Sequence, residues 1–540
     1  MVYGRVYPKH RTFLFPSSIC SSMNKNLPSL IQQMLLPSFY NHEVTPPIEL
    51  IQTHLSFVLL TGKYAYKVKK PVNFGFIDCS TLEKRYVFCK EELRLNQRLA
   101  PELYLKVISI SQKGSAFVIA ENNQEAVEYA VKMYQFPQSD LFINLFQAGK
   151  ITEDHIIEIA KKLVEFHRLA PTSEYIAGFG SVNSLRTVIE EHYHHTPKYI
   201  DVVQEQDLFE QTKAFTNSCF LKYSSLISER IQQGKVKECH GDIHLKNICL
   251  FEEKIQIFDS IEFNESFRNS DILYDIAFLF MDLNFRGKNS LANLLLNTYL
   301  EYSGNYEGVQ LLPLFTCMRA YIRATVTSFL IDDTSISPSE KQLIKEESAA
   351  YYRFAWKSTH SHHGKLIVMS GISGTGKSTI ARKIAQVLNA IHIRSDAVRK
   401  HIAGVSLMEK VQELYSVEMT EKTYTGLISL GILLANEGFN VILDAKFDRR
   451  SFRSSLIQQA ENSQISLQFI HCNSPLDILR QRLQKRLLSE DDISGATPEM
   501  LESQKLQFEE FSQAEMLGVM SIDTSQDNIE SIVQDILVRV

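Results

Sequence analysis

Apolar and polar residues alternate in short runs between residues 48 and 135, and this period of two is typical of β-strands. The runs are 55–60, 64–70, 107–110, 116–120 and 129–133. A stretch with helical periodicity, 82–99, interrupts them just before Pro101. From about residue 139 the pattern becomes helical, most clearly over 156–167, and helices are predicted up to Trp356 except around 248–258. The pattern predicts a small sheet with one inserted helix, followed by a helical region.

After residue 365 the chain alternates regularly between strand-like and helix-like segments. The predicted strands are 366–370, 390–393, 440–444 and 468–471, and the predicted helices are 377–388, 420–436 and 528–538. Such alternation predicts a mainly parallel sheet flanked by helices. The polar segment 358–364 precedes this region and holds three histidines. We interpret it as a linker and not as a metal site, because no acidic or thiol partner lies nearby.

These changes of pattern predict an N-terminal extension with a helix over 1–45, an α+β domain over 46–357, the linker 358–364 and an α/β domain over 365–540. The first 42 residues carry basic but no acidic side chains, as transit peptides do. However, Pro8 and Pro16 interrupt any amphipathic helix, so a disordered extension is favoured. Met23 is an alternative start, since a helical pattern begins just after it.

Composition narrows the functional classes. The 540 residues include 57 Lys and Arg against 62 Asp and Glu, a net charge of −5, so no general positive field would hold nucleic acid or an anionic membrane. Any anion site must be local. The 8 cysteines form no C-x-x-C pair, which argues against a disulfide framework or thiolate zinc site and favours a reducing cytoplasm. No run of about 18 apolar residues predicts a membrane span.

The segment GISGTGKS, residues 371–378, fits the phosphate-binding pattern G-x-x-x-x-G-K-[ST] and lies between a predicted strand and a predicted helix. Glycines allow backbone N–H groups to surround phosphates, a lysine neutralises the β- and γ-phosphate oxygens, and a hydroxyl serves Mg²⁺. An ordinary glycine-rich turn is the weaker alternative. The candidate residues for ATP are Gly371, Ile372, Ser373, Gly374, Thr375, Gly376, Lys377, Ser378 and Thr379, with Ser378 also predicted to bind Mg²⁺.

Residues around this loop favour a kinase over a switch or motor. Asp396 and Arg399 stand three residues apart at a predicted helix start, where the acid can accept a hydroxyl proton while the arginine holds an anionic group. Asp444 ends a hydrophobic strand, as a Mg²⁺-binding Walker B aspartate does. Arg482 and Arg486 lie on one predicted helix face before a polar segment, 489–497, that is a candidate lid. For the arginines, a solvated basic face is the alternative.

This set resembles the small P-loop kinases that include gluconate kinase, chloramphenicol phosphotransferase and the polynucleotide 5′-hydroxyl kinases, over about residues 365–540. The resemblance implies that Asp396 is the catalytic base and that Arg399 binds substrate. It also implies that Arg482 and Arg486 stabilise the transferring phosphoryl group. One departure is Lys446, which stands where the group commonly has Thr, Ser or Asn.

A second motif, HGDIHLKN at residues 240–247, follows the helical region, and Asp259 ends the next strand-like segment. Phosphoryl transfer needs a carboxylate to orient the acceptor hydroxyl, an amide oxygen for metal, and a second carboxylate that bridges Mg²⁺ and nucleotide phosphates. Asp242, Asn247 and Asp259 supply these groups in that order. An Asp and an Asn in a structural turn are the alternative.

The motif H-G-D-x-H-x-x-N with a later Asp resembles the aminoglycoside phosphotransferase-like branch of the two-lobed protein-kinase fold. Segments 163–167 and 271–277 resemble that branch as well. Strand alternation places Lys67 and Lys69 on one face, and Glu91 or Glu92 of the following helix can pair with one of them to contact ATP phosphates. We favour Lys67 with Glu92, and a solvated strand face is the alternative. No G-x-G-x-x-G loop is present. The order of both halves resembles a bacterial two-domain family in which such a domain is fused to a P-loop kinase or ATPase, over about 28–540.

The sequence thus predicts an ATP- and Mg²⁺-dependent phosphotransferase with two nucleotide sites, acting on a hydroxyl of a small molecule or a nucleic-acid end. The alternative is a signalling P-loop ATPase whose N-terminal half is a regulatory binding module. A third interpretation, aminoglycoside resistance, requires an acidic pocket. The candidates for that pocket are Glu262, Glu265, Asp332 and Asp333.

Overall fold

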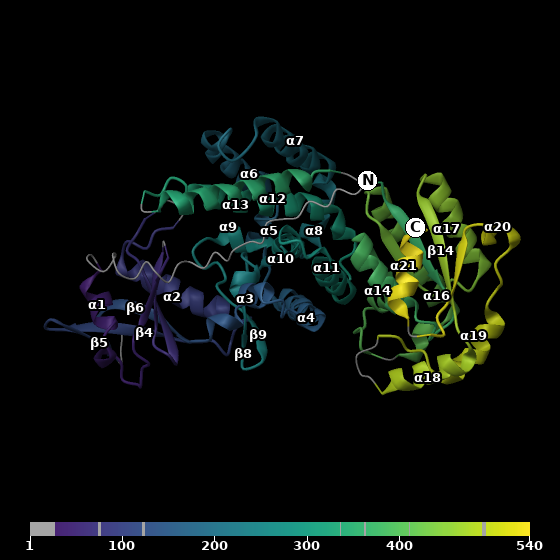
Figure 1. The fold of residues 1–540 in the computed structure, drawn as a ribbon, viewed down its shortest axis with the longest axis horizontal. Coiled ribbons are helices and arrows are strands. Elements are labelled where there is room, and N and C mark those ends of the chain that lie inside the picture. Colours follow the sequence, from purple (N-terminus) through teal and green to yellow (C-terminus); the bar gives the residue numbers. More distant parts are fainter. Residues whose placement is uncertain are drawn as a thin grey trace. The chain divides into compact units, whose positions relative to one another are not determined.

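The computed structural model describes residues 27–53, 55–73, 77–120, 125–334, 336–360, 363–409, 411–488, 493–526 and 528–539. The chain forms two compact units. The first contains the described residues up to Thr152 together with Glu238–Ser270, and the second contains Glu153–Lys237 together with the described residues from Asp271 onward. Figure 1 labels those elements of both units for which there is room.

The first unit is built on a six-stranded antiparallel sheet with the order β1-β2-β3-β6-β4-β5. Its strands are β1 (Glu49–Gln52), β2 (Ser56–Leu60), β3 (Tyr64–Lys69), β4 (Tyr104–Lys113), β5 (Ala116–Ala120) and β6 (Ala126–Tyr134). The alternating runs of the sequence are confirmed as strands, with β5 matched at both ends. Only β1 was not predicted, because most of its residues are exposed and no buried stripe marks it.

Helices cover both faces of this sheet. Helix α1 (Ser29–Met34) packs Ile31 and Met34 against Leu59 and Tyr66 on one face. Helix α2 (Leu82–Asn96) lies on the other, where Cys89 joins a cluster that includes Cys249 of the hairpin formed by β8 and β9. The hairpin and shorter helices are β8 (Ile248–Phe251), β9 (Lys254–Ile257), α3 (Phe142–Gln147) and α9 (Glu265–Arg268). The predicted inserted helix is therefore confirmed, ending three residues earlier than expected.

The second unit begins with a helical region, within the stretch whose pattern predicts helices. Its helices are α4 (Glu153–Leu169), α5 (Glu174–Gly178), α6 (Val182–His195), α7 (Gln206–Lys222), α8 (Ser224–Gln232), α10 (Ile272–Phe285), α11 (Asn289–Ser303), α12 (Leu312–Phe329) and α13 (Pro338–Lys357). Two short strands, β7 (Val236–Glu238) and β10 (Asn269–Asp271), lie where the chain passes between units. Within the described ranges, no helix combines the length and the apolarity needed to cross a bilayer.

The rest of the second unit is a five-stranded parallel sheet with the order β12-β13-β11-β14-β15. Its strands are β11 (Lys365–Ser370), β12 (Ile391–Arg394), β13 (Val441–Asp444), β14 (Ser466–Asn473) and β15 (Val519–Asp523). Its helices are α14 (Lys377–Leu388), α15 (Ser395–Ala403), α16 (Val417–Asn436), α17 (Arg450–Asn462), α18 (Leu476–Leu487), α19 (Leu501–Gln507), α20 (Gln513–Met516) and α21 (Ile529–Leu537). Helices α14 and α21 lie side by side (Figure 1), and their apolar residues share one core cluster with residues of the sheet. The predicted parallel sheet is confirmed.

The register of this sheet brings polar groups to one edge. Asp444 at the end of β13 lies beside Met369 of β11, and His471 of β14 lies beside Ser370. The loop 371–376 starts at the same edge, because it follows β11 directly. The expected boundary at 358–364 stays a prediction, since residues 361 and 362 lie outside the described part. The expectations for residues 1–26, including Met23 as the start, lie outside it too.

Candidate active sites

The phosphate-binding loop of the second unit has the backbone that its glycines permit. Gly371, Gly374 and Gly376 have φ angles of 128°, 83° and 78°, which side chains with a Cβ rarely adopt. A Cβ on Gly371 would collide with the carbonyl oxygen of Cys472, so the loop passes directly against β14. The amide of Gly371 donates to the carbonyl oxygen of Lys446 at 3.0 Å, which anchors the loop to the segment after β13.

Lys377 is the first residue of α14, and Ser378 and Thr379 follow in its first turn. The Lys377 ammonium donates to the carbonyl oxygen of Ile372 at 2.8 Å, so it lies over the loop itself. Burial lowers the pKa of Lys377, although the charge of Asp444 acts in the opposite direction. The predicted loop therefore has its cation and its helix N-terminus at one place, the arrangement that binds phosphate groups.

Asp444, the predicted Walker B residue, is only 4% exposed. Its Oδ2 lies 3.1 Å from His392 Nε2 and 3.9 Å from Arg394 Nε. Burial disfavours the charged carboxylate, but the His392 hydrogen bond and the charges of Arg394 and Lys377 outweigh it and hold the pKa of Asp444 below its usual range. An ionised carboxylate and the hydroxyl of Ser378 are oxygen donors that Mg²⁺ prefers, so these residues fit the ion.

Asp396 and Arg399 lie on α15, with Asp396 in its first turn. The Arg399 guanidinium donates to the carbonyl oxygen of Leu414 at 2.8 Å and lies 4.9 Å from the ring centre of Tyr415. Burial, followed by the negative charge of Asp396, raises the pKa of Tyr415 to about 12, while Arg399 and Arg486 act in the opposite direction. Asp396, Arg399 and Arg486 therefore all lie close enough to Tyr415 to affect its pKa.

Tyr415 was missed at the sequence level. It closes a single turn of 3₁₀-helix, Gln412–Tyr415, which is too short to leave a periodic pattern. Its hydroxyl accepts a hydrogen bond from the amide of Gly495 at 3.2 Å, so it connects the Asp396 region with the segment after α18. No local sequence signal distinguished this tyrosine from the other 21 in the chain.

The two arginines of α18 both face inward. Arg482 donates to the carbonyl oxygen of Thr524 at 2.7 Å, and its Nη1 would lie 4.0 Å from a Cβ on Gly376, next to the phosphate-binding loop. Arg486 lies within 3.3 Å of the carbonyl oxygen of Ala496. The solvated-face interpretation applies instead to Arg480, which pairs with Asp477 at the surface. Residues 489–492 of the predicted lid lie outside the described part.

The HGDIHLKN loop belongs to the first unit. Gly241 has a φ of 89°, and a Cβ there would lie 2.9 Å from the carbonyl oxygen of Phe267, so only glycine fits without a shift. The backbone N–H of Asp242 donates to His240 Nδ1 at 3.3 Å, so His240 Nε2 carries the proton that bonds the carbonyl oxygen of Phe258 at 3.0 Å. The loop is thereby fastened to the residue before Asp259.

Asn247 is oriented by Asp242. Its Nδ2 donates to both the carbonyl oxygen and Oδ2 of Asp242, each at 3.0 Å. The amide oxygen is therefore the group that Asn247 can offer to a cation. His244 Nε2 lies 3.3 Å from the same Asp242 carboxylate. The predicted base and the predicted metal ligand are thus brought together.

Five charged side chains form the other half of this site. Lys67 Nζ lies 2.8 Å from Glu92 and 2.7 Å from Asp259, which confirms that Lys67 and Glu92 pair. Lys69 also contacts Glu92, at 2.7 Å, and forms an ion pair with Glu262. Asp259 adopts a φ of 63° and remains 46% exposed at its side chain, so it faces outward from the cluster.

Burial and ion pairing shift the pKa values of the side chains in this cluster. Burial raises the pKa of Glu92, but the charges of Lys67 and Lys69 together have the larger effect and lower this pKa to about 2. For Lys69, burial works against the charge, but Glu262 and Glu92 outweigh it and raise the pKa above its usual value. Burial raises the pKa of Glu262 despite Lys69. The solvated-strand alternative is wrong for Lys69, which is only 2% exposed.

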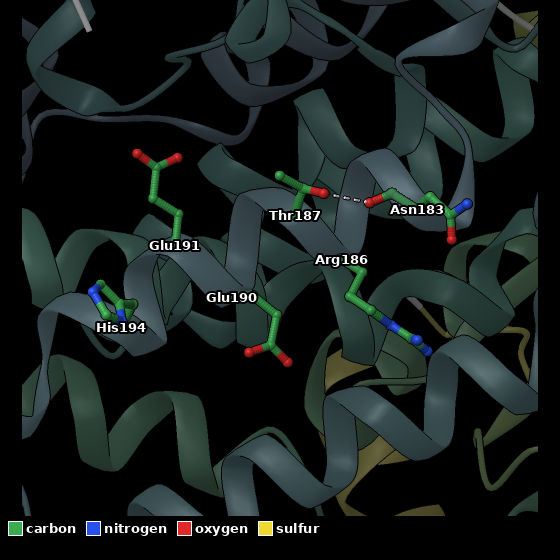
Figure 2. Close-up of a pocket in the computed structure, with 6 residues that line it drawn as sticks. All are labelled: Asn183, Arg186, Thr187, Glu190, Glu191 and His194. Atoms are coloured by element: carbon green, nitrogen blue, oxygen red, sulfur yellow. Dashed lines mark hydrogen bonds between the residues drawn. The ribbon is translucent and has the colours of Figure 1, made fainter. Parts of the chain in front are cut away.

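Three of the four acids considered for a polycation pocket form ion pairs within their own unit. Glu262 pairs with Lys69, Glu265 with Arg268 at 3.3 Å, and Asp332 with Lys198 at 2.6 Å. A separate depression in the second unit is lined by six residues of α6, none of them a predicted site residue (Figure 2). These residues are Asn183, Arg186, Thr187, Glu190, Glu191 and His194.

His167, in the helix that resembles the kinase branch, is a core residue. It is 2% exposed, and its ring nitrogens lie 2.9 Å from the Tyr299 hydroxyl and 3.1 Å from Asp275. Asp271, the other acid of the 271–277 segment, caps the start of α10 and binds Arg230 at 2.6 Å. Both acids therefore organise the helical region.

Residues 366–511 match the family model AAA_33, an AAA domain. Together with the loop geometry, this match establishes a P-loop domain in the C-terminal part of the chain. An uncharacterized protein of Mycobacterium tuberculosis is 27% identical over 465 residues, covering 84% of this chain and 90% of the relative. A cytidylate kinase of Desulforamulus reducens is 31% identical over 90 residues, or 17% of this chain and 39% of the kinase. A choline/ethanolamine kinase family structure from Mesorhizobium loti covers 61% of this chain and 97% of its own, with 10% identity and a TM-score of 0.37.

Proposed function

We propose that this chain is an ATP- and Mg²⁺-dependent phosphotransferase with two nucleotide sites, one in a kinase-like two-lobed domain over 46–357 and one in a P-loop kinase domain over 365–540. Each site transfers the γ-phosphate of ATP to a hydroxyl of a small molecule or a nucleic-acid end. The observation that carries the proposal is the place of Lys377, Asp444 and Asp396 at one edge of the parallel sheet: Asp444 ends β13 beside Met369 and Arg394, Asp396 lies in the first turn of the helix after β12, and Lys377 starts the helix after the loop that follows β11.

In the P-loop site, Lys377 and the loop amides hold the ATP phosphates, and Asp396 accepts the proton of the acceptor hydroxyl. The acceptor oxygen forms a bond to the γ-phosphorus as the bond from that phosphorus to the β,γ-bridging oxygen breaks, and ADP leaves. Arg399 and Tyr415 border the acceptor, while Arg482 and Arg486 approach the phosphates from α18. Asp444 and Ser378 would hold Mg²⁺, which when bound would neutralise phosphate charge.

In the N-terminal site, Asp242 takes the role of Asp396, with its carboxylate oriented by Asn247 and His244. Asn247 and Asp259 supply the metal oxygens, and Lys67, braced by Glu92, contacts the phosphates. The direct contact between Lys67 and Asp259 supports this assignment, because nucleotide and Mg²⁺ would enter between two groups that already attract each other.

The function is tested by transfer of γ-labelled phosphate from ATP into a metabolite extract. Lys377→Ala and Asp242→Asn are each expected to remove a different labelled product, because the two residues belong to separate phosphate sites. The double variant should remove both. ATP consumption that needs no acceptor would favour the signalling ATPase, and loss of every product by either single variant would contradict two independent sites.

Lys67→Ala is expected to weaken ATP binding at the N-terminal site by about 1.5–3 kcal/mol, the contribution of a charge-assisted contact. The measurement is calorimetric titration of the full chain carrying Lys377→Ala, which silences the P-loop site. Lys63→Ala, exposed just before β3, is the matched control and should bind normally. Binding should also require Mg²⁺, because no G-x-G-x-x-G loop is present. Binding that survives both EDTA and Lys67→Ala would remove this half from the kinase assignment.

A further inference from the structure

One face of α11 runs along the edge strand of the parallel sheet, and both elements belong to the second unit. Asn293, Asn297 and Glu301 are spaced four residues apart, so they form one stripe on the helix. Asn293 and Asn297 both donate to the carbonyl oxygen of Ala390 at 2.9 Å, and Asn297 accepts from the amide of His392 at 2.8 Å. Two side-chain amides therefore occupy backbone groups that a neighbouring strand would use.

The rise per residue of a helix and of a strand explains why this stripe of α11 matches the edge of β12. Four residues of helix rise about 6 Å, and two residues of strand rise about 6.6 Å, so every fourth helical residue meets every second strand residue. Glu301 continues the series by accepting from Arg394 Nη1 at 2.8 Å. Strand β12 stands first in the sheet order, so α11 covers its outer edge.

The same residues of β12 surround Asp444. The His392 ring lies 3.1 Å from the Asp444 carboxylate, while the His392 amide is held by Asn297. Arg394 is held by Glu301 at 2.8 Å and lies 3.9 Å from Asp444. The Arg394 guanidinium therefore lies between the carboxylate of Glu301 in the helical region and that of Asp444 in the P-loop site, and it is closer to Glu301.

The end of α11 also supports α15, the helix with Asp396. His401 Nε2 donates to the carbonyl oxygen of Glu301 at 2.8 Å. Tyr302 packs against a small apolar cluster of Ala397, Leu407 and Ile493. A displacement of α11 would thus disturb the surroundings of Asp396, the predicted base of the P-loop site, and of Asp444, its predicted metal ligand.

We propose that Glu301 is a positioning residue that holds Arg394 away from Asp444, so that the helical region sets the Mg²⁺ affinity of the P-loop site. This inference rests on the proposed role of Asp444 as a metal ligand. Without Glu301, the half-buried guanidinium closes on Asp444 and competes with the cation for the same carboxylate oxygens.

The test is Mg²⁺ affinity, measured calorimetrically on the full chain saturated with β,γ-imido-ATP and carrying Asp259→Asn to silence the N-terminal metal site. Glu301→Gln is expected to weaken Mg²⁺ binding about tenfold, the size of one charge-assisted contact. Glu301→Gln with Arg394→Met should recover it to within about twofold, because the competitor is gone. Glu307→Gln, an exposed glutamate nearby, is the matched control and should change nothing.

Equal weakening in the single and the double variant would make Glu301 a merely structural residue and overturn the inference. If Glu301→Gln does not fold, the test uses Arg394→Met alone. The inference requires this variant to bind Mg²⁺ at least as tightly as the chain with Arg394, and weaker binding would overturn it. Asp444→Asn separates the two proposals. Loss of Mg²⁺ binding in Asp444→Asn with no effect of Glu301→Gln rejects only the role of Glu301. Unchanged Mg²⁺ binding in Asp444→Asn rejects the metal site itself and the inference with it.

Discussion

Replacing Asp396 by asparagine is expected to slow phosphoryl transfer at the P-loop site by about 10²- to 10⁴-fold, the contribution of a general base. Asn has nearly the same shape but cannot accept the hydroxyl proton. ATP binding should hardly change, because Asp396 lies on α15, while the phosphates are held by the loop before α14. The predicted loss therefore falls on the turnover rate and not on nucleotide affinity.

The measurement compares single-turnover transfer with nucleotide affinity in the full chain carrying Asp242→Asn, which leaves only the P-loop site active. Asp477→Asn is the matched control, since Asp477 also lies in the first turn of a helix of this domain but is 88% exposed at its side chain. That variant should transfer phosphate normally. A parallel loss of ATP affinity and turnover in Asp396→Asn would assign Asp396 to the metal shell.

Lys69→Met is expected to destabilise the first unit by about 3–5 kcal/mol, the cost of leaving a buried charge without its partner. The ammonium of Lys69 connects Glu92 with Glu262, and all three side chains are buried. Trp356, the only tryptophan, lies in α13 of the second unit and does not report on this region. Hydrogen exchange of amides in β3 and α2 is therefore the appropriate measurement.

The stability loss in Lys69→Met should depend on pH. Glu262 has a raised pKa already, and without Lys69 it is raised further above its value in the unfolded chain. Such a group stabilises the fold when protonated, so the loss should shrink as the pH falls and grow as the pH rises. Adding Glu262→Gln should recover most of the stability at neutral pH. Lys106→Met, exposed on β4, should have an effect within about 0.5 kcal/mol. A loss independent of pH and of Glu262 would point to packing instead.

Sequence periodicity predicted the elements that carry strong patterns. Helix α14 was predicted with both ends correct, because a strand and the phosphate-binding glycines fix its start and its apolar stripe runs to the last turn. Strands β1 and β15 were missed because both are edge strands with few buried positions and with polar residues in their short sequences, whereas the edge strand β5 is a continuous apolar run. Where one face of a strand is not buried, alternation carries little information.

The predictions of site residues also succeeded where the sequence carries a local pattern and failed where it does not. Motif spacing identified Asp242 and Asn247, which contact each other, and Lys67 with Glu92. It named Glu262 only as a candidate for an acidic pocket and not as the partner of Lys69, and it missed Tyr415 altogether, because these contacts form through tertiary folding. For Arg399, the spacing from Asp396 predicts a role in binding the acceptor. Only the structure shows that its guanidinium donates a hydrogen bond to the carbonyl oxygen of Leu414. Long-range contacts of this kind leave no local trace.

The asparagine stripe of α11 also bears on how the two halves of the chain tolerate separation. An edge strand with free amides and carbonyl groups is a template on which another chain can add a strand. Asn293 and Asn297 block that template at Ala390 and His392. A P-loop fragment cut free at the predicted linker would lose this cover and expose the edge of β12, so its tendency to self-associate would rise even if its core stayed folded. We therefore expect the helical region to limit self-association of the P-loop part through this edge.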